Sequence, residues 1–169
     1  MKKRSKLFVF ILLLGVLFYF KDDIYNYTYS IINTSNESYD IENLPEYDGN
    51  SYVIVNDNIP YFKEEEYTTT SFEKYSELDL LGRCGVASAN ISKDLMPTEK
   101  RGSIGMIKPS GWHTIKYDHI DGKYLYNRCH LIGYQLTGEN ANEKNLITCT
   151  RSMNTKGMLQ FENMVTKYI

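Results

Sequence analysis

The most constraining stretch of the sequence lies in its last third. Arg128 and His130 stand two residues apart in a run with strand character, Tyr126–Ile132. Side chains alternate between the two faces of a β-strand, so we expect Arg128 and His130 on the same face. A polar loop then leads to a second strand-like run, Leu146–Thr150, and a helical tail follows. The pattern predicts a strand, loop, strand and helix unit that holds a cation beside a proton acceptor.

The helical tail, from about Gly157 to Ile169, carries a carboxylate on an apolar face. The residues that recur at helical spacing and form this face are Met158, Phe161, Val165, Tyr168 and Ile169, flanked by Leu159 and Met164. Glu162 falls within the same face. Burying a carboxylate there is costly unless it is paired or bound to a metal. The pattern therefore predicts a functional role for Glu162.

Charge is distributed unevenly along the chain, although the formal net charge is only −2. Residues 22–81 hold 14 acidic and 2 basic side chains, whereas residues 82–169 hold 12 basic and 7 acidic ones. This asymmetry fits a domain that binds a polyanion behind an acidic stalk. A solvated surface without a partner explains such a distribution about as often.

The N-terminus resembles an export signal. Basic residues between Lys2 and Lys6 precede an apolar run, Leu7–Phe20, with no small-residue cleavage site after it. The run is short for a spanning helix, which needs ~20 residues, and it is long enough for a signal-peptide core. Residues 1–21 are predicted to be a signal peptide or an uncleaved signal anchor. The basic flank predicts that the remainder is extracellular or at the cell surface.

The rest of the chain divides into a linker and one globular domain. Residues 22–50 lack sustained periodicity and are predicted to be an acidic, polar stalk. Residues 51–169 are predicted to form an α+β domain with a mixed or antiparallel sheet. Gly85–Ile91 is a candidate central strand, and Asp121-Gly122 is a hairpin turn signal before Lys123–Arg128.

Three cysteines allow at most one disulfide within the chain. Cys129 and Cys149 could pair if their strands pair. Most buried single cysteines are small apolar fillers, so we expect Cys84, Cys129 and Cys149 to be unpaired. A thiol enzyme is disfavoured because neighbours on a strand, such as Cys129 and His130, face opposite sides. A zinc module is disfavoured because the cysteines lack the paired spacing of structural zinc sites.

The polar residues around the two strands suit phosphodiester hydrolysis. His130 is a candidate base, since an unperturbed histidine pKa of roughly 6.5 suits neutral pH. Arg128 can donate to two phosphate oxygens at once. Mg²⁺ needs only one or two protein oxygens. The Asn154 amide oxygen can contact it directly, although a helix cap explains Asn154 about equally well, and Glu162 can be a ligand or accept from metal-bound waters. Asn145 either fixes the loop after His130 through its backbone or contacts the phosphate.

The pattern is less informative for one arginine and two histidines. Arg151 is a candidate contact to the nucleic-acid backbone, and an ordinary surface role explains it equally well. His113 and His119 have no such companions and are expected to be structural.

The motif Asn127-Arg128-Cys129-His130-Leu131-Ile132-Gly133-Tyr134, followed by Asn145-Leu146-Ile147-Thr148 and Met153-Asn154, resembles the DNA/RNA non-specific endonuclease family. These proteins are also called His-Me finger nucleases, and the resemblance is to their streptodornase-like secreted DNases. The resemblance implies a ββα-metal finger over residues 123–169, with Mg²⁺ or Mn²⁺ as cofactor and DNA or RNA as substrate. The matched positions are His130 as general base, Arg128 as the motif arginine, Asn145 as the first downstream asparagine, Asn154 as the metal-binding asparagine and Glu162 as the metal-site glutamate.

Three departures from the family pattern stand out. Asn127 replaces the motif aspartate, and Cys129 replaces a glycine or serine. The family continues past the helix that ends here, which implies a nuclease domain shortened at its C-terminus. The expected function is a Mg²⁺-dependent, largely sequence-non-specific endonuclease. The alternative is a degenerate, non-catalytic remnant that binds nucleic acid.

Overall fold

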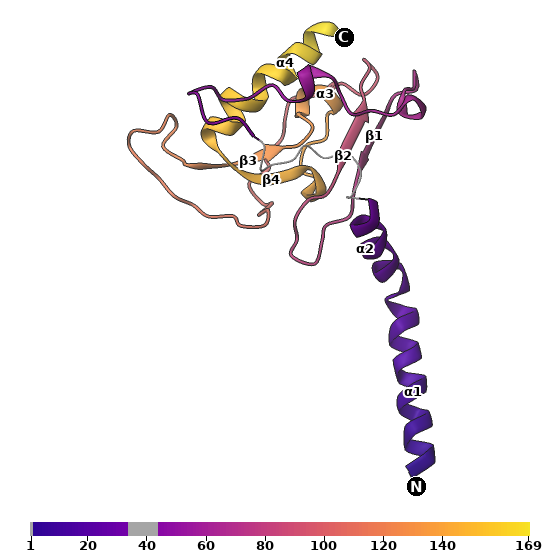
Figure 1. The fold of residues 1–169 in the computed structure, drawn as a ribbon. Helices are drawn as coiled ribbons and strands as arrows, with labels where there is room; N and C mark the ends of the chain where they lie inside the picture. Colours follow the sequence, from indigo (N-terminus) through magenta and orange to yellow (C-terminus); the bar gives the residue numbers. More distant parts are fainter. Residues whose placement is uncertain (1, 34–43) are drawn as a thin grey trace. The chain divides into compact units, whose positions relative to one another are not determined.

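The computed structural model describes residues 2–33 and 44–169, and its contacts divide the chain into two units. The first comprises residues 1–46 and 54–61, and the second comprises residues 47–53 and 62–169. The second unit contains every predicted site residue. Figure 1 shows the elements in chain order.

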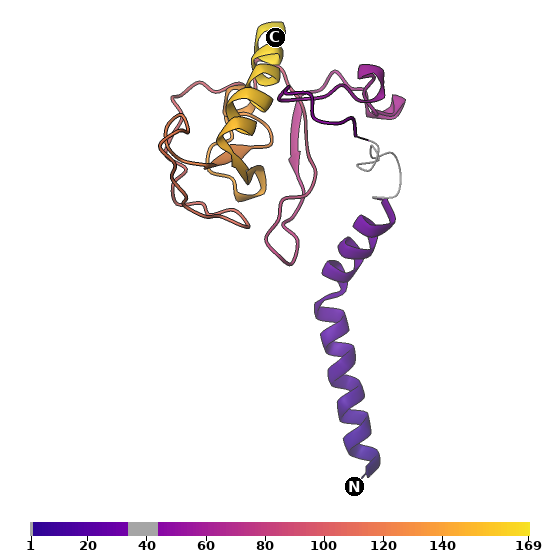
Figure 2. The ribbon, with the colours of Figure 1, turned by 60° about the vertical axis from the view of Figure 1, so that its left-hand side comes forward.

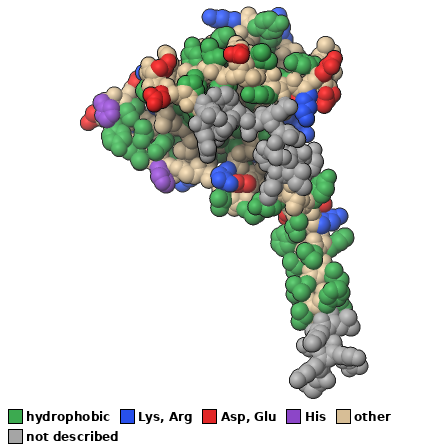
Figure 3. Space-filling model, viewed as in Figure 1, with side chains coloured by type: hydrophobic (Ala, Val, Ile, Leu, Met, Phe, Trp, Pro, Cys, Tyr) green, Lys and Arg blue, Asp and Glu red, His purple; other side chains and the backbone are tan. Residues whose placement is uncertain are grey.

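The first unit contains helices α1 (Lys2–Tyr19) and α2 (Lys21–Asn33) and the 3-10 turn η2 (Asn56–Asn58). The apolar side chains from Val9 to Phe20 are exposed, and Figure 3 shows apolar side chains along these helices. Within the described ranges, no helix combines the length and the apolarity needed to cross a bilayer. A signal peptide or anchor over residues 1–21 stays a prediction.

Helix α2 was not expected, because residues 22–50 show no sustained periodicity. Asp22 and Asp23 lie in its first turn, where negative charge stabilises the positive end of the helix dipole. Residues 34–43 of the predicted stalk lie outside the described residues.

The second unit has two small antiparallel sheets, which confirms an α+β fold. Strand β1 (Phe72–Tyr75) pairs with β2 (Ala87–Asn90), and β3 (Tyr126–His130) pairs with β4 (Leu146–Thr150). In the second pair His130 lies opposite Leu146. The expected mixed or antiparallel sheet is present as two separate antiparallel pairs in the described residues.

Short helices connect and cover the strands. They are η3 (Glu64–Glu66), α3 (Tyr134–Thr137), η4 (Glu143–Asn145), the π-helix η5 (Met153–Met158) and α4 (Leu159–Tyr168). Figures 1 and 2 show α4 beside the β3–β4 pair. The predicted strand, loop, strand and helix order is confirmed. The helical tail starts earlier than expected, because a π-turn precedes α4.

A disulfide joins Cys129 and Cys149 across the β3–β4 pair, with their Cα atoms 5.9 Å apart. Both residues are buried. The register explains the bond, because Cys149 lies opposite Asn127, one diagonal step from Cys129. The expectation that these two cysteines are separate apolar fillers is therefore wrong. Cys129 and His130 face opposite sides of the strand, as predicted.

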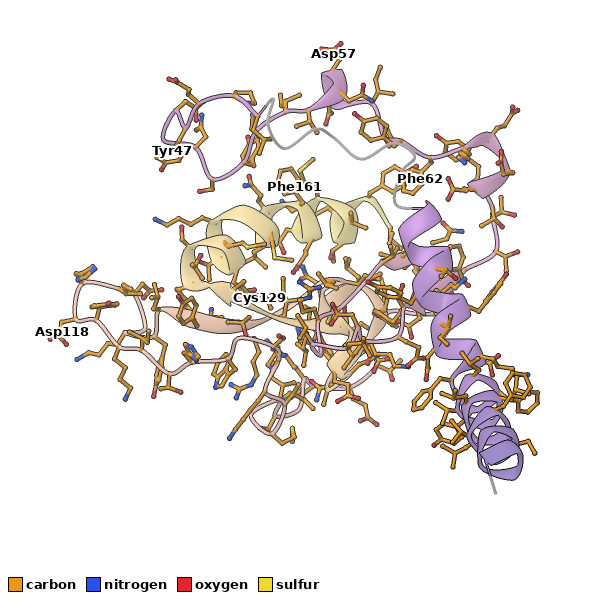
Figure 4. The ribbon with its side chains drawn as sticks, turned by 60° about the horizontal axis from the view of Figure 1, so that its bottom comes forward. Tyr47, Asp57, Phe62, Asp118, Cys129 and Phe161 are labelled. Atoms are coloured by element: carbon orange, nitrogen blue, oxygen red, sulfur yellow. A yellow bond between two sulfur atoms is a disulfide. The ribbon has the colours of Figure 1, made fainter. Side chains whose placement is uncertain are left out.

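The apolar face of α4 is less covered than its periodicity predicts. Phe161 is 44% exposed and Tyr168 92% exposed. The Tyr52 ring meets Phe161 edge-on, with ring centroids 5.1 Å apart. Figure 4 shows Phe161 pointing away from the strand that carries Cys129. The prediction of a buried face is wrong for these residues, because α4 turns its polar side chain Glu162 toward the strands.

Candidate active site

A cavity of about 320 Å³ lies between strand β3, the loop after it, and helices η5 and α4. Its lining residues are Arg101, Arg128, His130, Gly133, Tyr134, Gln135, Asn154, Thr155, Leu159 and Glu162. Four predicted site residues, at positions 128, 130, 154 and 162, thus share one cavity. Asn145 and Arg151 do not line it.

His130 ends β3 and is 7% exposed. Its Nε2 lies 2.8 Å from the backbone oxygen of Asn140. A carbonyl oxygen only accepts hydrogen bonds, so Nε2 carries the proton and Nδ1 is the free base. Burial lowers the pKa of His130, while the Asn140 carbonyl opposes this effect and the Arg101 charge adds to it. The imidazole is therefore neutral and fixed in one tautomer at neutral pH.

Asn145 holds the chain that leaves β3. It is fully buried, its Oδ1 accepts from the Ile132 N–H at 2.8 Å, and its Nδ2 donates to the Ile132 carbonyl at 3.0 Å. Its own backbone oxygen accepts from the Leu131 N–H at 2.9 Å. Of the two roles left open, the structure thus shows bonding of the loop backbone.

Glu162 projects from α4 into the cavity. Its Oε2 lies 3.5 Å from Nε2 of Gln135, which also donates to Asn163 at 3.2 Å. Burial raises the pKa of Glu162, and the charge of Arg101 partly offsets that rise. The half-buried carboxylate therefore favours a nearby cation.

Asn154 reaches the same cavity from η5. The backbone N–H of Leu159 donates to the Asn154 carbonyl, closing the wider π-type turn. Within the described part of the chain, no hydrogen bond engages the Asn154 side chain. Single π-helical turns of this kind are frequent at functional sites. Here the π-helical turn places Asn154 before α4, which carries Glu162.

Arg128 lines the cavity but is already braced. Its Nε donates to the Ile107 carbonyl and its Nη2 donates to the Gly105 carbonyl at 2.9 Å. Its Cζ lies 3.8 Å from the centroid of the Trp112 ring. Three of its five N–H donors remain for other partners. Arg128 thus ties the loop over residues 105–112 to β3.

Arg101 lines the cavity and was not singled out from the sequence. It is exposed, lines the cavity, and makes no ion pair or hydrogen bond with any described residue. Its charge acts on the pKa of both His130 and Glu162. No motif marks position 101 in the sequence. Only the basic character of residues 82–169 points toward it.

Arg151 stands elsewhere and has a structural partner. Its Nη2 donates to the Asp121 carboxylate at 2.8 Å, and its guanidinium packs beside Gly122. A contact from Arg151 to nucleic acid stays a prediction.

The residues that line the cavity fit a hard divalent cation. They offer a half-buried carboxylate at Glu162 and an unengaged amide oxygen at Asn154. Mg²⁺ prefers oxygen ligands and usually keeps several waters, so two protein oxygens are sufficient. Within the described residues, no cluster of three or more His, Cys, Asp or Glu side chains could hold a metal by itself.

Comparison with known families decides the assignment. A family model described as DNA/RNA non-specific endonuclease matches residues 63–169. The chain belongs to this family. The match confirms the resemblance carried by the motif around His130 and covers the whole cavity.

One solved structure supports the fold. The crystal structure of NucA from Streptococcus agalactiae with a magnesium ion bound has a TM-score of 0.51 and 21% identity, over 60% of this chain and 51% of NucA. The NucA structure with no metal bound has a TM-score of 0.49 and 23% identity, over the same shares. This endonuclease-family chain therefore spans about half the length of NucA. No curated protein shows significant sequence similarity to it.

Proposed function

We propose that this protein is a Mg²⁺-dependent, largely sequence-non-specific endonuclease that hydrolyses phosphodiester bonds of DNA or RNA. The observation that carries the proposal is the shared cavity of His130, Asn154 and Glu162. A neutral base with a fixed tautomer lies beside oxygen donors suited to a hard cation. Family membership supports the same activity.

His130 is the proposed general base. Its Nδ1 removes a proton from the attacking water. Its Nε2 keeps its own proton and continues to donate a hydrogen bond to the Asn140 carbonyl. That carbonyl stabilises the imidazolium that forms, because it accepts a hydrogen bond from a positively charged ring. The fixed tautomer removes the need for the ring to reorient during the reaction.

Two arginines are proposed to hold the phosphate. Arg101 has all its donors available within the described structure, whereas Arg128 contributes those donors that the Gly105 and Ile107 carbonyls leave unused. Asn154 and Glu162 would hold Mg²⁺, or Mn²⁺ in its place. When bound, the cation offsets negative charge on the phosphate and the leaving oxygen. Most contacts reach the nucleic-acid backbone, so we expect binding to weaken with salt and to show little sequence preference.

The proposed location is extracellular or at the cell surface, through a signal peptide or signal anchor. The basic and then apolar N-terminus supports export. The Cys129–Cys149 disulfide also supports it, because disulfides persist in oxidising compartments. Fractionation of expressing cells tests this part, since recovery of the chain in the cytoplasm with reduced cysteines would contradict it.

A plasmid-nicking assay on the full chain tests the activity, with Mg²⁺ and with EDTA. The variant is His130→Ala, and the matched control is His119→Ala, which changes an exposed histidine whose ring lies 5.4 Å from that of Tyr117. We expect metal-dependent cutting by the wild type and the control, and its loss in His130→Ala. A folded wild type that binds DNA but does not cut would favour the degenerate binder.

The thiol alternative is not supported by the site. Cys129 is bonded to Cys149, and it faces away from His130. Cutting that resists EDTA and is lost on thiol alkylation would nevertheless revive it.

A further inference from the structure

The Glu162 carboxylate lies directly against the backbone of Gly133. A Cβ on Gly133 would lie 2.6 Å from Cδ, 2.7 Å from Oε2 and 3.1 Å from Oε1 of Glu162. Ordinary contacts of a Cβ begin at 3.4 Å. The Gly133 backbone has φ −59° and ψ 142°, which any residue adopts. The backbone conformation thus permits a side chain at position 133, but the carboxylate end of the Glu162 side chain would have to move away to make room for it.

The backbone at Gly133 cannot easily withdraw from the carboxylate. The preceding residue, Ile132, is held by both side-chain groups of Asn145. The Gly133 carbonyl accepts from the Leu136 N–H at 2.9 Å, which fixes the start of α3. Gly133 itself is buried. Any side chain at this position therefore has to displace Glu162 and not the loop.

We propose that Gly133 is a positioning residue for the cation site. Its missing side chain allows the Glu162 carboxylate to lie against the loop after His130 and to face the same cavity as Asn154. This inference rests on the proposed metal-dependent function, which it deepens. It assigns to Gly133 the placement of a ligand, whereas His130, Asn154 and Glu162 supply the chemistry.

A rescue experiment on the full-length chain tests the inference. The variants are Gly133→Ala, Glu162→Asp and the double variant, and the readouts are Mn²⁺ binding by electron paramagnetic resonance and Mg²⁺-dependent plasmid nicking. We expect Gly133→Ala to weaken Mn²⁺ binding about 10- to 100-fold, as is typical when a ligand's support is altered. A side chain shorter by one methylene withdraws from the added methyl, so the double variant should bind Mn²⁺ more tightly than Gly133→Ala alone.

Gly85→Ala is the matched control, because its Cβ would also clash, at 2.9 Å from Cβ of Ser76, but away from the cavity. It should lower the melting temperature and leave Mn²⁺ affinity unchanged. If Gly133→Ala alone does not fold, the double variant must recover both folding and Mn²⁺ binding.

Two results separate the inference from the function beneath it. The first result concerns only Gly133. If the wild type binds Mn²⁺ and cuts, the role of Gly133 is overturned when Gly133→Ala binds Mn²⁺ as tightly as the wild type, or when the double variant binds it no more tightly than Gly133→Ala. A folded wild type that neither binds Mn²⁺ nor cuts overturns the proposed function and this inference together.

Discussion

Replacing Asn145 with alanine would test the loop that carries the cavity. The change leaves the Ile132 N–H and carbonyl without the two partners they have at 2.8 and 3.0 Å. Each backbone group buried without a partner costs about 1–3 kcal/mol, so the pair costs about 2–5 kcal/mol after some relaxation. For a domain of this size, that corresponds to a fall in melting temperature of about 10–20 °C.

Urea unfolding of the full chain measures this cost. Trp112 is the only tryptophan and stacks on Arg128, so its fluorescence reports on unfolding of the region around the cavity. Asn142→Ala is the matched control, because it removes only a cap to the Lys144 N–H, at a cost of about 1 kcal/mol. The proposed role of the Asn145 bonds to Ile132 is refuted if the free energy of unfolding of Asn145→Ala is nearly unchanged but the variant no longer cuts DNA. That result would place Asn145 on the phosphate.

Three further predictions concern the base, the arginines and the disulfide. Burial lowers the pKa of His130 from 6.5, so cutting should fall only as the pH drops below that value and the ring becomes protonated. Arg101→Ala should reduce kcat/KM without changing the melting temperature, whereas Arg128→Ala should lower both, because it removes the brace at Gly105 and Ile107. Reducing the disulfide, which closes a loop of 20 residues, should cost about 3 kcal/mol of stability.

Each of these predictions has a result that would contradict it. An acid limb above pH 6.5 would mean that another group titrates. Arg101→Ala with full activity would show that its guanidinium does not meet the phosphate. For the disulfide, Cys84→Ser is the control, because this cysteine is free. Equal melting temperatures with and without reductant would show that the bond adds no stability.

The ββα unit could be predicted from sequence because its signals are local. Alternation along Tyr126–His130 places Arg128 and His130 on one face, and the apolar period of the tail marks Glu162 as an exception. The strand pairing then brings the residues into one cavity. The resemblance to the endonuclease family pointed to the same residues, and the family model matches residues 63–169.

Other features depend on contacts between distant parts of the chain and could not be predicted. Arg101 enters the cavity from a loop without periodicity. The disulfide follows from the register of β3 and β4, which sequence spacing alone does not fix. Arg128 donates hydrogen bonds to the backbone carbonyls of Gly105 and Ile107, and no side-chain pattern in the sequence predicts where these carbonyls lie.

The proposed function requires that Asn154 and Glu162 hold a divalent cation in the cavity that His130 lines. A crystal of the full chain soaked in Mn²⁺ and measured for anomalous scattering tests it most directly. We expect an anomalous peak within coordination distance of the Asn154 and Glu162 side-chain oxygens. A well-ordered cavity with no peak, or a peak bound only by other residues, would contradict it.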